Sequence, residues 1–209
     1  MIDYSIETKI TKLPEGIKTI RESAFANCEN LYITKLPEGV EKIETNAFSD
    51  CPNLALTELP STLTYLGMQS FWRCVKIDLK ELPEQLTEIK SSTFSNCKGL
   101  TLKELPAKVT MIGSSAFQSC SSLTEMTCKG DIKTINSYAF NLCEKLAKFV
   151  LPNVTSVPTL SATSAFTGTA IDKGLGYIYV PDNLVENFKN ATNWNYFANK
   201  IKPISEMEE

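Results

Sequence analysis

The 209-residue sequence contains no histidine. This absence excludes a Ser-His-Asp triad, a Cys-His dyad and any metal site built on imidazole. Acid–base chemistry at neutral pH would then need an aspartate, glutamate, lysine or cysteine with a strongly shifted pKa. We therefore expect a protein that is not an enzyme, with no catalytic residues, no metal and no cofactor.

Long apolar runs and an excess of basic residues are also missing. No run approaches the roughly 18 apolar residues that a membrane-spanning helix needs. The chain has 21 basic and 24 acidic residues, a net charge of −3, so nothing directs it to nucleic acid or to an anionic membrane. Residues 1–4 lack the basic start and apolar stretch of a signal peptide. This leaves a cytosolic protein, or one whose leader is not part of this sequence.

Three residue types instead recur every 23 residues. A Leu-Pro step starts at Leu13, Leu36, Leu59, Leu82, Leu105 and, two periods on, Leu151. A phenylalanine column consists of Phe25, Phe48, Phe71, Phe94, Phe117 and Phe140. A cysteine column follows three residues later, at Cys28, Cys51, Cys74, Cys97, Cys120 and Cys143. A leucine-rich period of about 20–30 residues is the signature of a solenoid, in which neighbouring repeats stack to share one core.

We predict a right-handed, β-rich leucine-rich-repeat solenoid of short strands and short helical or 3-10 turns, closed by a small α/β C-terminal cap. Residues 1–12 form a partial first repeat, 13–150 six repeats, 151–173 a degenerate seventh repeat, and 174–209 the cap. Each repeat has an extended stretch such as 100–105, a short strand such as 109–112, and a single helical turn such as 114–120. A serine at the start of that turn can cap it.

The cysteine column has two interpretations. Equivalent residues of a solenoid stack about 4.8 Å apart, and free cysteine packs as a small buried hydrophobic residue. We therefore expect a column of buried thiols, joined in the core by Cys128. Disulfide pairing is the alternative, and a metal site is disfavoured because no paired Cys-x-x-Cys is present.

The inward-facing pattern changes within the array. In four repeats it follows the spacing Leu31, Ile33, Leu36, whereas in the next two it follows Leu123, Met126, Cys128. Because side chains alternate between the faces of a strand, this shift predicts a local change in the sheet between residues 105 and 123. Phe166 comes 26 residues after Phe140, which predicts a three-residue insertion within 158–163.

The C-terminal segment no longer repeats. We expect a strand at 177–180, a helix at 184–191 with Asp182 or Asn183 near its N-cap, and a second helical piece carrying Trp194, Tyr196 and Phe197. These aromatic residues fit a plug over the open end of the solenoid; a platform for a sugar or peptide is the alternative. Residues 205–209 are expected to fray.

Candidate binding residues lie on the outward face of the extended stretches. They are Tyr32, Glu58, Asp78, Lys80, Glu81, Lys103 and Glu104. Glu58, Glu81 and Glu104 fall in one column, where like charges repel, and Lys80 and Lys103 beside them are expected to offset part of this. A solvated strand face is the alternative to a stripe that recognises a partner. Charge reversal at the three glutamates is expected to alter partner capture without lowering thermal stability.

Trp72 and Arg73 form a second candidate. Trp72 is the large aromatic residue in a column otherwise filled by Ala26, Ser49, Ser95, Gln118 and Asn141. Tryptophan and arginine are enriched in interaction hot spots, but packing over a neighbouring turn is the favoured explanation.

With these residues in view, the chain resembles the BspA-like, or Treponema-type, leucine-rich repeat proteins. Residues 120–143 match the family unit Cys-x-x-Leu-x-x-Ile-x-Leu-Pro-x-x-Val-x-x-Ile-x-x-x-Ala-Phe-x-x-Cys, with Met126 for Ile, Cys128 for Leu and Lys129 for Pro. The segments 179–182, 188–194 and 201–205 look like the end of such proteins in Bacteroides-type bacteria.

The resemblance implies a surface or secreted protein that binds other macromolecules, including host matrix proteins in some members, and it brings no catalytic residues. We expect a non-catalytic adhesion module that recognises a protein or glycan on the sheet face and does not insert into a membrane. The alternative is a structural spacer or assembly module of a larger envelope protein. A location at the cell surface or outside the cell is favoured over the cytoplasm.

Overall fold

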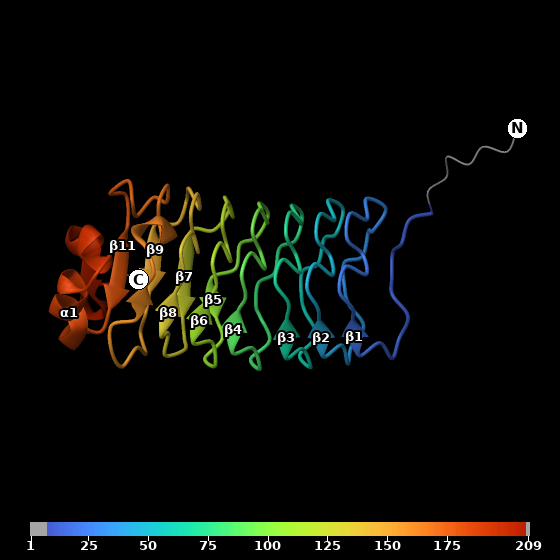
Figure 1. Ribbon diagram of the computed structural model, residues 1–209, viewed down its shortest axis with the longest axis horizontal. Helices are drawn as coiled ribbons and strands as arrows, with labels where there is room; N and C mark the ends of the chain where they lie inside the picture. The colour runs from blue at the N-terminus through green and yellow to red at the C-terminus, as the bar shows by residue number, and fades with distance from the viewer. Residues whose placement is uncertain (1–7, 208–209) are drawn as a thin grey trace, which may run out of the picture.

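The computed structural model describes residues 8–207, so residues 1–7 of the expected first repeat and the last two residues of the tail lie outside the description. The repeats stack side by side into an elongated coil, with the C-terminal helical segment at one end (Figure 1). This confirms the leucine-rich-repeat solenoid predicted from the 23-residue period.

Short parallel strands run along one side of the coil. These are β1 (Thr19–Ile20), β2 (Lys42–Ile43), β3 (Tyr65–Leu66), β4 (Glu88–Ile89), β6 (Met111–Ile112), β8 (Thr134–Ile135) and β10 (Thr159–Leu160). Each carries an isoleucine or leucine whose side chain enters the core. They form two sheets, β1-β2-β3 and β4-β6-β8-β10, with no pairing between β3 and β4.

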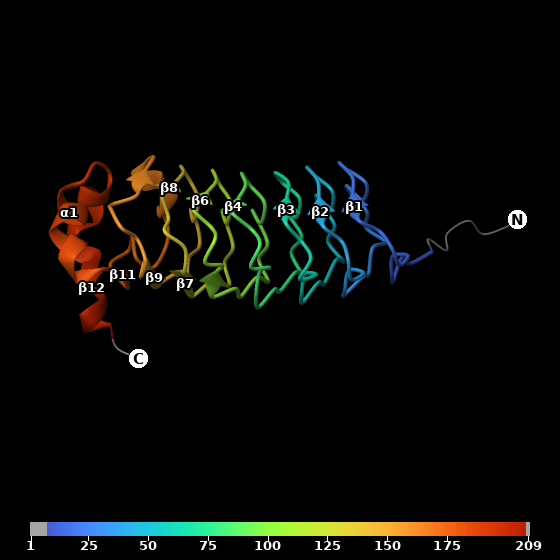
Figure 2. The same cartoon turned by 90° about the horizontal axis from the view of Figure 1, so that it is seen from below.

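The other side of the coil carries a sheet only in the C-terminal half of the described chain. Its strands are β5 (Glu104–Leu105), β7 (Glu125–Cys128), β9 (Lys148–Val150), β11 (Tyr177–Val180) and β12 (Ile201–Pro203). Figure 2 shows β7, β9, β11 and β12 opposite the strands of the first side. The predicted change at 105–123 is confirmed, because the sheet begins where Glu104 pairs with Thr127.

The sheet face expected on the extended stretches does not form at 31–36, 54–59 or 77–82. Their inward residues are spaced as in Ile33 and Leu36, with two residues between them, so strict alternation fails and the backbone bends at Thr34, Thr57 and Lys80. From Met126 to Cys128 the inward spacing becomes two, and a regular strand forms.

The predicted short helical or 3-10 turns are present as 3-10-type turns and do not form a regular helix. The segment 21–28 consists of overlapping turns in which Ala24, Ala26 and Cys28 donate N–H bonds to the carbonyls three residues before them. Ser23 and Asn27 lie in the left-handed region, at φ 55° and 61°, so the segment cannot be a helix. The intervening N–H groups of Ser23, Phe25 and Asn27 donate to the next repeat. Equivalent left-handed pairs recur every 23 residues as far as Tyr138 and Leu142.

The core is a stack of aromatic rings beside a column of thiols. The phenylalanine rings from Phe25 to Phe140 and then Phe166 stack with centroids 5.2–5.7 Å apart. The predicted thiol column is confirmed: all seven cysteines are free, six are buried, and Cys28 in the first repeat is half-buried. Cys74 Sγ donates a 2.9 Å hydrogen bond to the carbonyl of Phe48, and the other cysteines from Cys51 to Cys143 in the repeat column bond in the same way.

The three-residue insertion is real, but its predicted position is wrong in part. β10 pairs with β8 at Thr159 and Thr134, 25 residues apart. Since Leu151 lies 23 residues after Cys128, two inserted residues fall between Leu151 and Thr159. The third falls between Leu160 and Phe166.

The C-terminal segment closes the stack. Its helices are η1 (Thr163–Ala165), η2 (Asp182–Leu184), α1 (Val185–Asn190), η3 (Trp194–Lys200) and η4 (Ile204–Glu206). Trp194 and Phe197 lie against the ring of Phe166, at centroid distances of 6.2 and 5.6 Å, as expected of a plug. Trp194 Nε1 donates to the carbonyl of Pro158, which satisfies its buried polar atom.

Two local predictions in this segment are wrong. Neither Asp182 nor Asn183 caps α1; its N-cap is Leu184, which makes no side-chain capping bond. Asp182 Oδ1 instead accepts the N–H of Ser205. Ser205 is therefore held in η4, so the tail does not fray from this residue.

Candidate functional site

A groove follows the corner of the coil at which the extended stretches reach the Leu-Pro step. Its larger part, of about 580 Å³, lies between two neighbouring repeats and is lined by Thr57, Glu58, Leu59, Ser61, Lys80, Glu81, Leu82, Pro83, Glu84 and Gln85. A smaller part of about 210 Å³ shares Lys80, Glu81, Leu82 and Glu84 and extends to Glu104, Pro106 and Lys129. We call these two parts together the Leu-Pro groove.

The larger part lies where the strand ladder is interrupted. β3 and β4 belong to different sheets, and within residues 8–207 no backbone hydrogen bond joins 57–66 to 80–90. The neighbouring repeats on either side are joined, by β2 to β3 and by β4 to β6. The larger part of the groove thus lies between the same two repeats as the interruption of the strand ladder, which we call the seam.

The groove carries more negative than positive charge. Its lining contains four glutamates, Glu58, Glu81, Glu84 and Glu104, and two lysines, Lys80 and Lys129. Lys129 pairs with Glu104 at 2.5 Å, and a hydrogen bond to Glu104, with the nearby charges of Glu104, Glu84 and Glu81, raises the pKa of Lys129. Among the residues described, neither Glu81 nor Glu84 has an ion pair.

Lys80 and Lys103 were expected to offset the repulsion within the glutamate column, but in the structure they pair with other residues. Glu58 pairs with Lys35 at 2.8 Å, one repeat earlier, and Glu104 pairs with Lys129. Lys103 forms an ion pair with Glu125, at 2.6 Å, and Lys80 forms one with Asp78. Neither Lys80 nor Lys103 therefore pairs with the column, and Glu81 forms no ion pair within residues 8–207.

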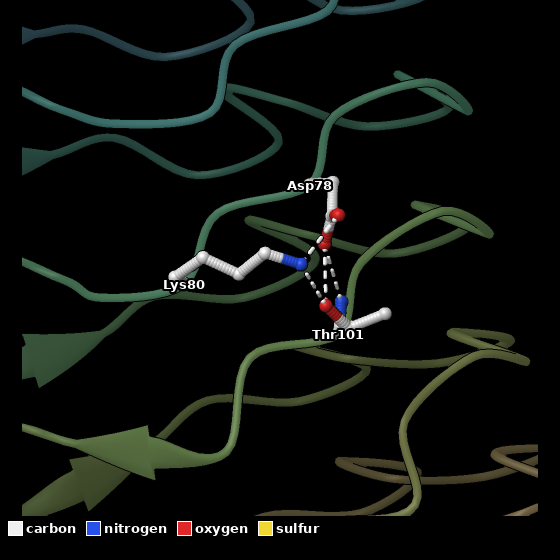
Figure 3. A network of polar contacts seen from close by, with 3 residues as sticks. All are labelled: Asp78, Lys80 and Thr101. Atoms are coloured by element: carbon white, nitrogen blue, oxygen red, sulfur yellow. Dashed lines mark hydrogen bonds and ion pairs between the residues drawn. The ribbon is translucent and has the colours of Figure 1, made fainter.

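Asp78 forms a polar cluster with Lys80 and Thr101 at the edge of the groove (Figure 3). Asp78 Oδ1 accepts bonds from the N–H and hydroxyl of Thr101, at 3.0 and 2.6 Å, and Oδ2 accepts from Lys80 at 2.7 Å. Burial raises the pKa of Asp78, but the bonds from Lys80 and Thr101 outweigh it and lower the pKa. The Asp78 carboxylate therefore takes the place of a backbone carbonyl as the acceptor for the Thr101 N–H. This happens one turn before the sheet that starts with β5.

The remaining candidates lie apart from the groove. Tyr32 is 37% exposed and its ring lies under Lys9, 4.8 Å from the centroid. Trp72 is half-buried, with the Arg73 guanidinium 5.1 Å from its ring. Arg73 also pairs with Asp50 at 3.2 Å. Of the nine predicted residues, only Glu58, Lys80, Glu81 and Glu104 line the groove.

Sequence reasoning missed Glu84, Gln85 and Lys129 as groove residues. The signal for Glu84 was present, because the residue after the Leu-Pro step is also glutamate at Glu15 and Glu38. Lys129 stands where other repeats have the proline, which marks it as an unusual corner residue.

The polar groups that line the Leu-Pro groove are carboxylates, ammonium groups, hydroxyls and one amide. No group of three or more potential metal ligands occurs in residues 8–207. Burial raises the pKa of the thiols of Cys97, Cys120 and Cys128, so these sulfurs stay protonated and enclosed. In the same part of the chain, no helix has the length and apolar character needed to cross a bilayer.

Stacked 23-residue coils with parallel short strands and an inward leucine-phenylalanine-cysteine core define a leucine-rich repeat solenoid. The chain belongs to the BspA type leucine-rich repeat family, which matches residues 3–101, 56–173 and 80–199 in six copies. No curated protein matches the chain.

Solved structures of similar proteins come from three bacteria. The chain is similar to the T. pallidum leucine-rich repeat protein, with 28% identity, a TM-score of 0.67, and coverage of 85% of this chain and 77% of that one. A leucine-rich cell surface protein of Faecalibacterium prausnitzii is 20% identical, with a TM-score of 0.43 and coverage of 91% and 62%. A leucine-rich repeat protein of Bacteroides ovatus is 18% identical, with a TM-score of 0.35 and coverage of 93% and 84%.

Proposed function

We propose that this protein is a non-catalytic binding module of the cell surface that recognises a protein or glycan through the face bearing the Leu-Pro groove. The observation that carries the proposal is the groove itself. It lies between two repeats whose strands β3 and β4 are unpaired, and it presents Glu81 and Glu84, which have no ion pair within residues 8–207. Solenoids offer extended surfaces of this kind for binding.

Absence of catalysis is part of the proposal. The chain has no histidine, and the thiols from Cys51 to Cys143 are buried. The groove holds glutamates and lysines that face solvent. A surface with these groups can select a partner by charge and shape.

An array of extracellular-matrix proteins and glycans, probed with the intact chain, tests the proposal. We expect capture of at least one partner, and weaker capture by the triple variant E58K/E81K/E104K, with only a small fall in melting temperature because the ion pairs of Glu58 and Glu104 lie at the surface. Antibody labelling of intact cells tests the location at the surface. Unlabelled cells together with an array without captured partners would contradict the proposal and favour the spacer role.

A further inference from the structure

Resting on the proposed binding function, we propose that the Leu-Pro groove takes an extended, basic segment of a protein partner. Lysine or arginine side chains of that segment are directed at Glu81 and Glu84. The inference names the class of partner and the two residues that select it.

The shape of the groove fits a peptide. Its larger part holds about 580 Å³ and continues past Leu82 into the smaller part, so it admits several consecutive residues. Leu59, Leu82 and Pro83 contribute apolar surface to its lining. Lysine and arginine pack their alkyl stems along such surface while the charged head reaches a polar rim. No lining residue is aromatic, so a sugar ring finds nothing on which to stack.

The charges that line the groove determine whether a basic or an acidic segment can bind. Lys80 is held by Asp78 and Thr101, and Lys129 is held by Glu104. Glu81 and Glu84 are the lining carboxylates that have no ion pair within residues 8–207. A cationic side chain of the partner can form a charge-assisted hydrogen bond with either carboxylate, and arginine can form two at once. An acidic segment is instead repelled by these carboxylates.

The seam explains why this position differs from other corners of the coil. Elsewhere the strands beyond the Leu-Pro step are tied together, as β2 is to β3. Between β3 and β4 no such pairing exists, and the larger part of the Leu-Pro groove lies between the same two repeats. An extended segment therefore lies along a junction whose strands β3 and β4 are unpaired, although the turn segments of the two repeats remain hydrogen-bonded.

Fluorescence anisotropy with a labelled ten-residue peptide of alternating alanine and arginine tests the proposal. The variant E81Q/E84Q should bind this peptide about tenfold more weakly, since two exposed charge pairs are lost. The matched control is E29Q/E144Q, which removes the same net charge from exposed sites away from the groove. It should bind as the wild type does, and an alanine-glutamate peptide should not bind.

A second variant tests whether a lysine placed inside the groove competes with the peptide for the glutamates. Ser61 lines the groove and is exposed, so S61K places a cation beside the glutamates and should also weaken binding of the arginine peptide. Equal affinity of the wild type, E81Q/E84Q and S61K would overturn the inference. So would equal losses in E81Q/E84Q and the control, because binding would then follow net charge alone.

The two proposals fail in different ways. If the wild type captures a partner on the array and E81Q/E84Q captures it equally well, the binding function stands and the groove inference falls. If the wild type captures nothing on the array, the proposed function falls, whatever the anisotropy shows.

Discussion

The cysteines of the repeat column have two roles in the core: they fill space and they donate hydrogen bonds. Each thiol from Cys51 to Cys143 in the repeat column fills space beside the phenylalanine stack and donates to the carbonyl of the phenylalanine 26 residues earlier. In most repeats that carbonyl also accepts the N–H of the cysteine in its own repeat, as Phe25 O does from Cys28 and Phe71 O does from Cys74. The thiol therefore satisfies a second lone pair that alanine would leave empty.

Thiol reactivity should separate the first repeat from the others. Cys28 is half-buried, and burial, with the nearby Cys51, raises its pKa. The pKa of Cys143 is raised to about 12 by burial. Iodoacetamide at pH 8 should modify Cys28 alone in the native protein and all seven cysteines in denaturant, by mass spectrometry. Cys28→Ala should remove the native label; rapid labelling of several thiols would contradict the buried column.

Ser70 is a buried residue whose hydroxyl has no hydrogen-bond partner among the residues described. Its column holds alanine at Ala47 and Ala116, and threonine at Thr93, whose hydroxyl donates to the carbonyl of Lys90. Ser70→Ala should therefore raise the free energy of unfolding by about 1 kcal/mol, because an unsatisfied group leaves the core. Thr93→Ala should lower it. Chemical denaturation measures both, and a loss on Ser70→Ala would contradict the assignment.

Leu142 is strained by its backbone. It has φ 58° and is 46% exposed, in a column otherwise made of polar residues such as Asn27, Asn96 and Ser119. Leu142→Asn should stabilise the protein by up to about 1 kcal/mol, since asparagine tolerates the left-handed region. Leu175→Asn is the control, because Leu175 is 73% exposed at an ordinary φ. Thermal melts should shift upward only for the first variant.

At the scale of the element, the spacing of the inward-facing residues predicted where the sheet that starts with β5 begins. A spacing of two, from Met126 to Cys128, gives a strand, whereas the three-residue step from Ile33 to Leu36 gives a bend. The left-handed turns were harder to predict, because Arg73 and Leu142 interrupt the small polar residues that favour such φ values. The seam could not be predicted, since residues 59–89 keep the common repeat pattern. Only the three-dimensional pairing of strands shows where a groove opens.

The Asp78 cluster ties two repeats together beside that seam. Asp78→Asn should lower the free energy of unfolding by about 1 kcal/mol at pH 7, because it weakens bonds to a charged acceptor that is partly exposed. The folded-state pKa of Asp78 is lowered, so its contribution is present above the unfolded pKa of about 3.9 and is lost as the pH falls through the folded pKa.

Urea denaturation between pH 7 and pH 2 measures this dependence. The difference between the wild type and Asp78→Asn should be constant near neutrality and shrink below about pH 4. Glu144→Gln removes an exposed carboxylate that has no ion pair in residues 8–207, and it should leave stability unchanged. A difference that grows on acidification would show that the carboxylate is not stabilised in the folded state.

At the scale of the whole molecule, each repeat is stabilised by its two neighbours. Phe94 is buried between Phe71 and Phe117, with centroids 5.7 and 5.5 Å away. Phe25 is half-buried and stacks on Phe48 at 5.4 Å. In such an array, stability sums over repeats and the interfaces between neighbours. A residue in the middle therefore supports two interfaces, and one in the first repeat supports mainly one.

Phe94→Ala should accordingly cost about 3–5 kcal/mol, the usual loss for a buried phenylalanine, and Phe25→Ala distinctly less. Hydrogen exchange read residue by residue distinguishes the modes of unfolding. Phe25→Ala should lose protection at β1 and β2 while β8 and β9 keep theirs, whereas Phe94→Ala should lower protection on both sides of the seam. Equal losses at every amide in both variants would mean that the solenoid unfolds as one unit, and the seam between β3 and β4 would then be no boundary of cooperativity.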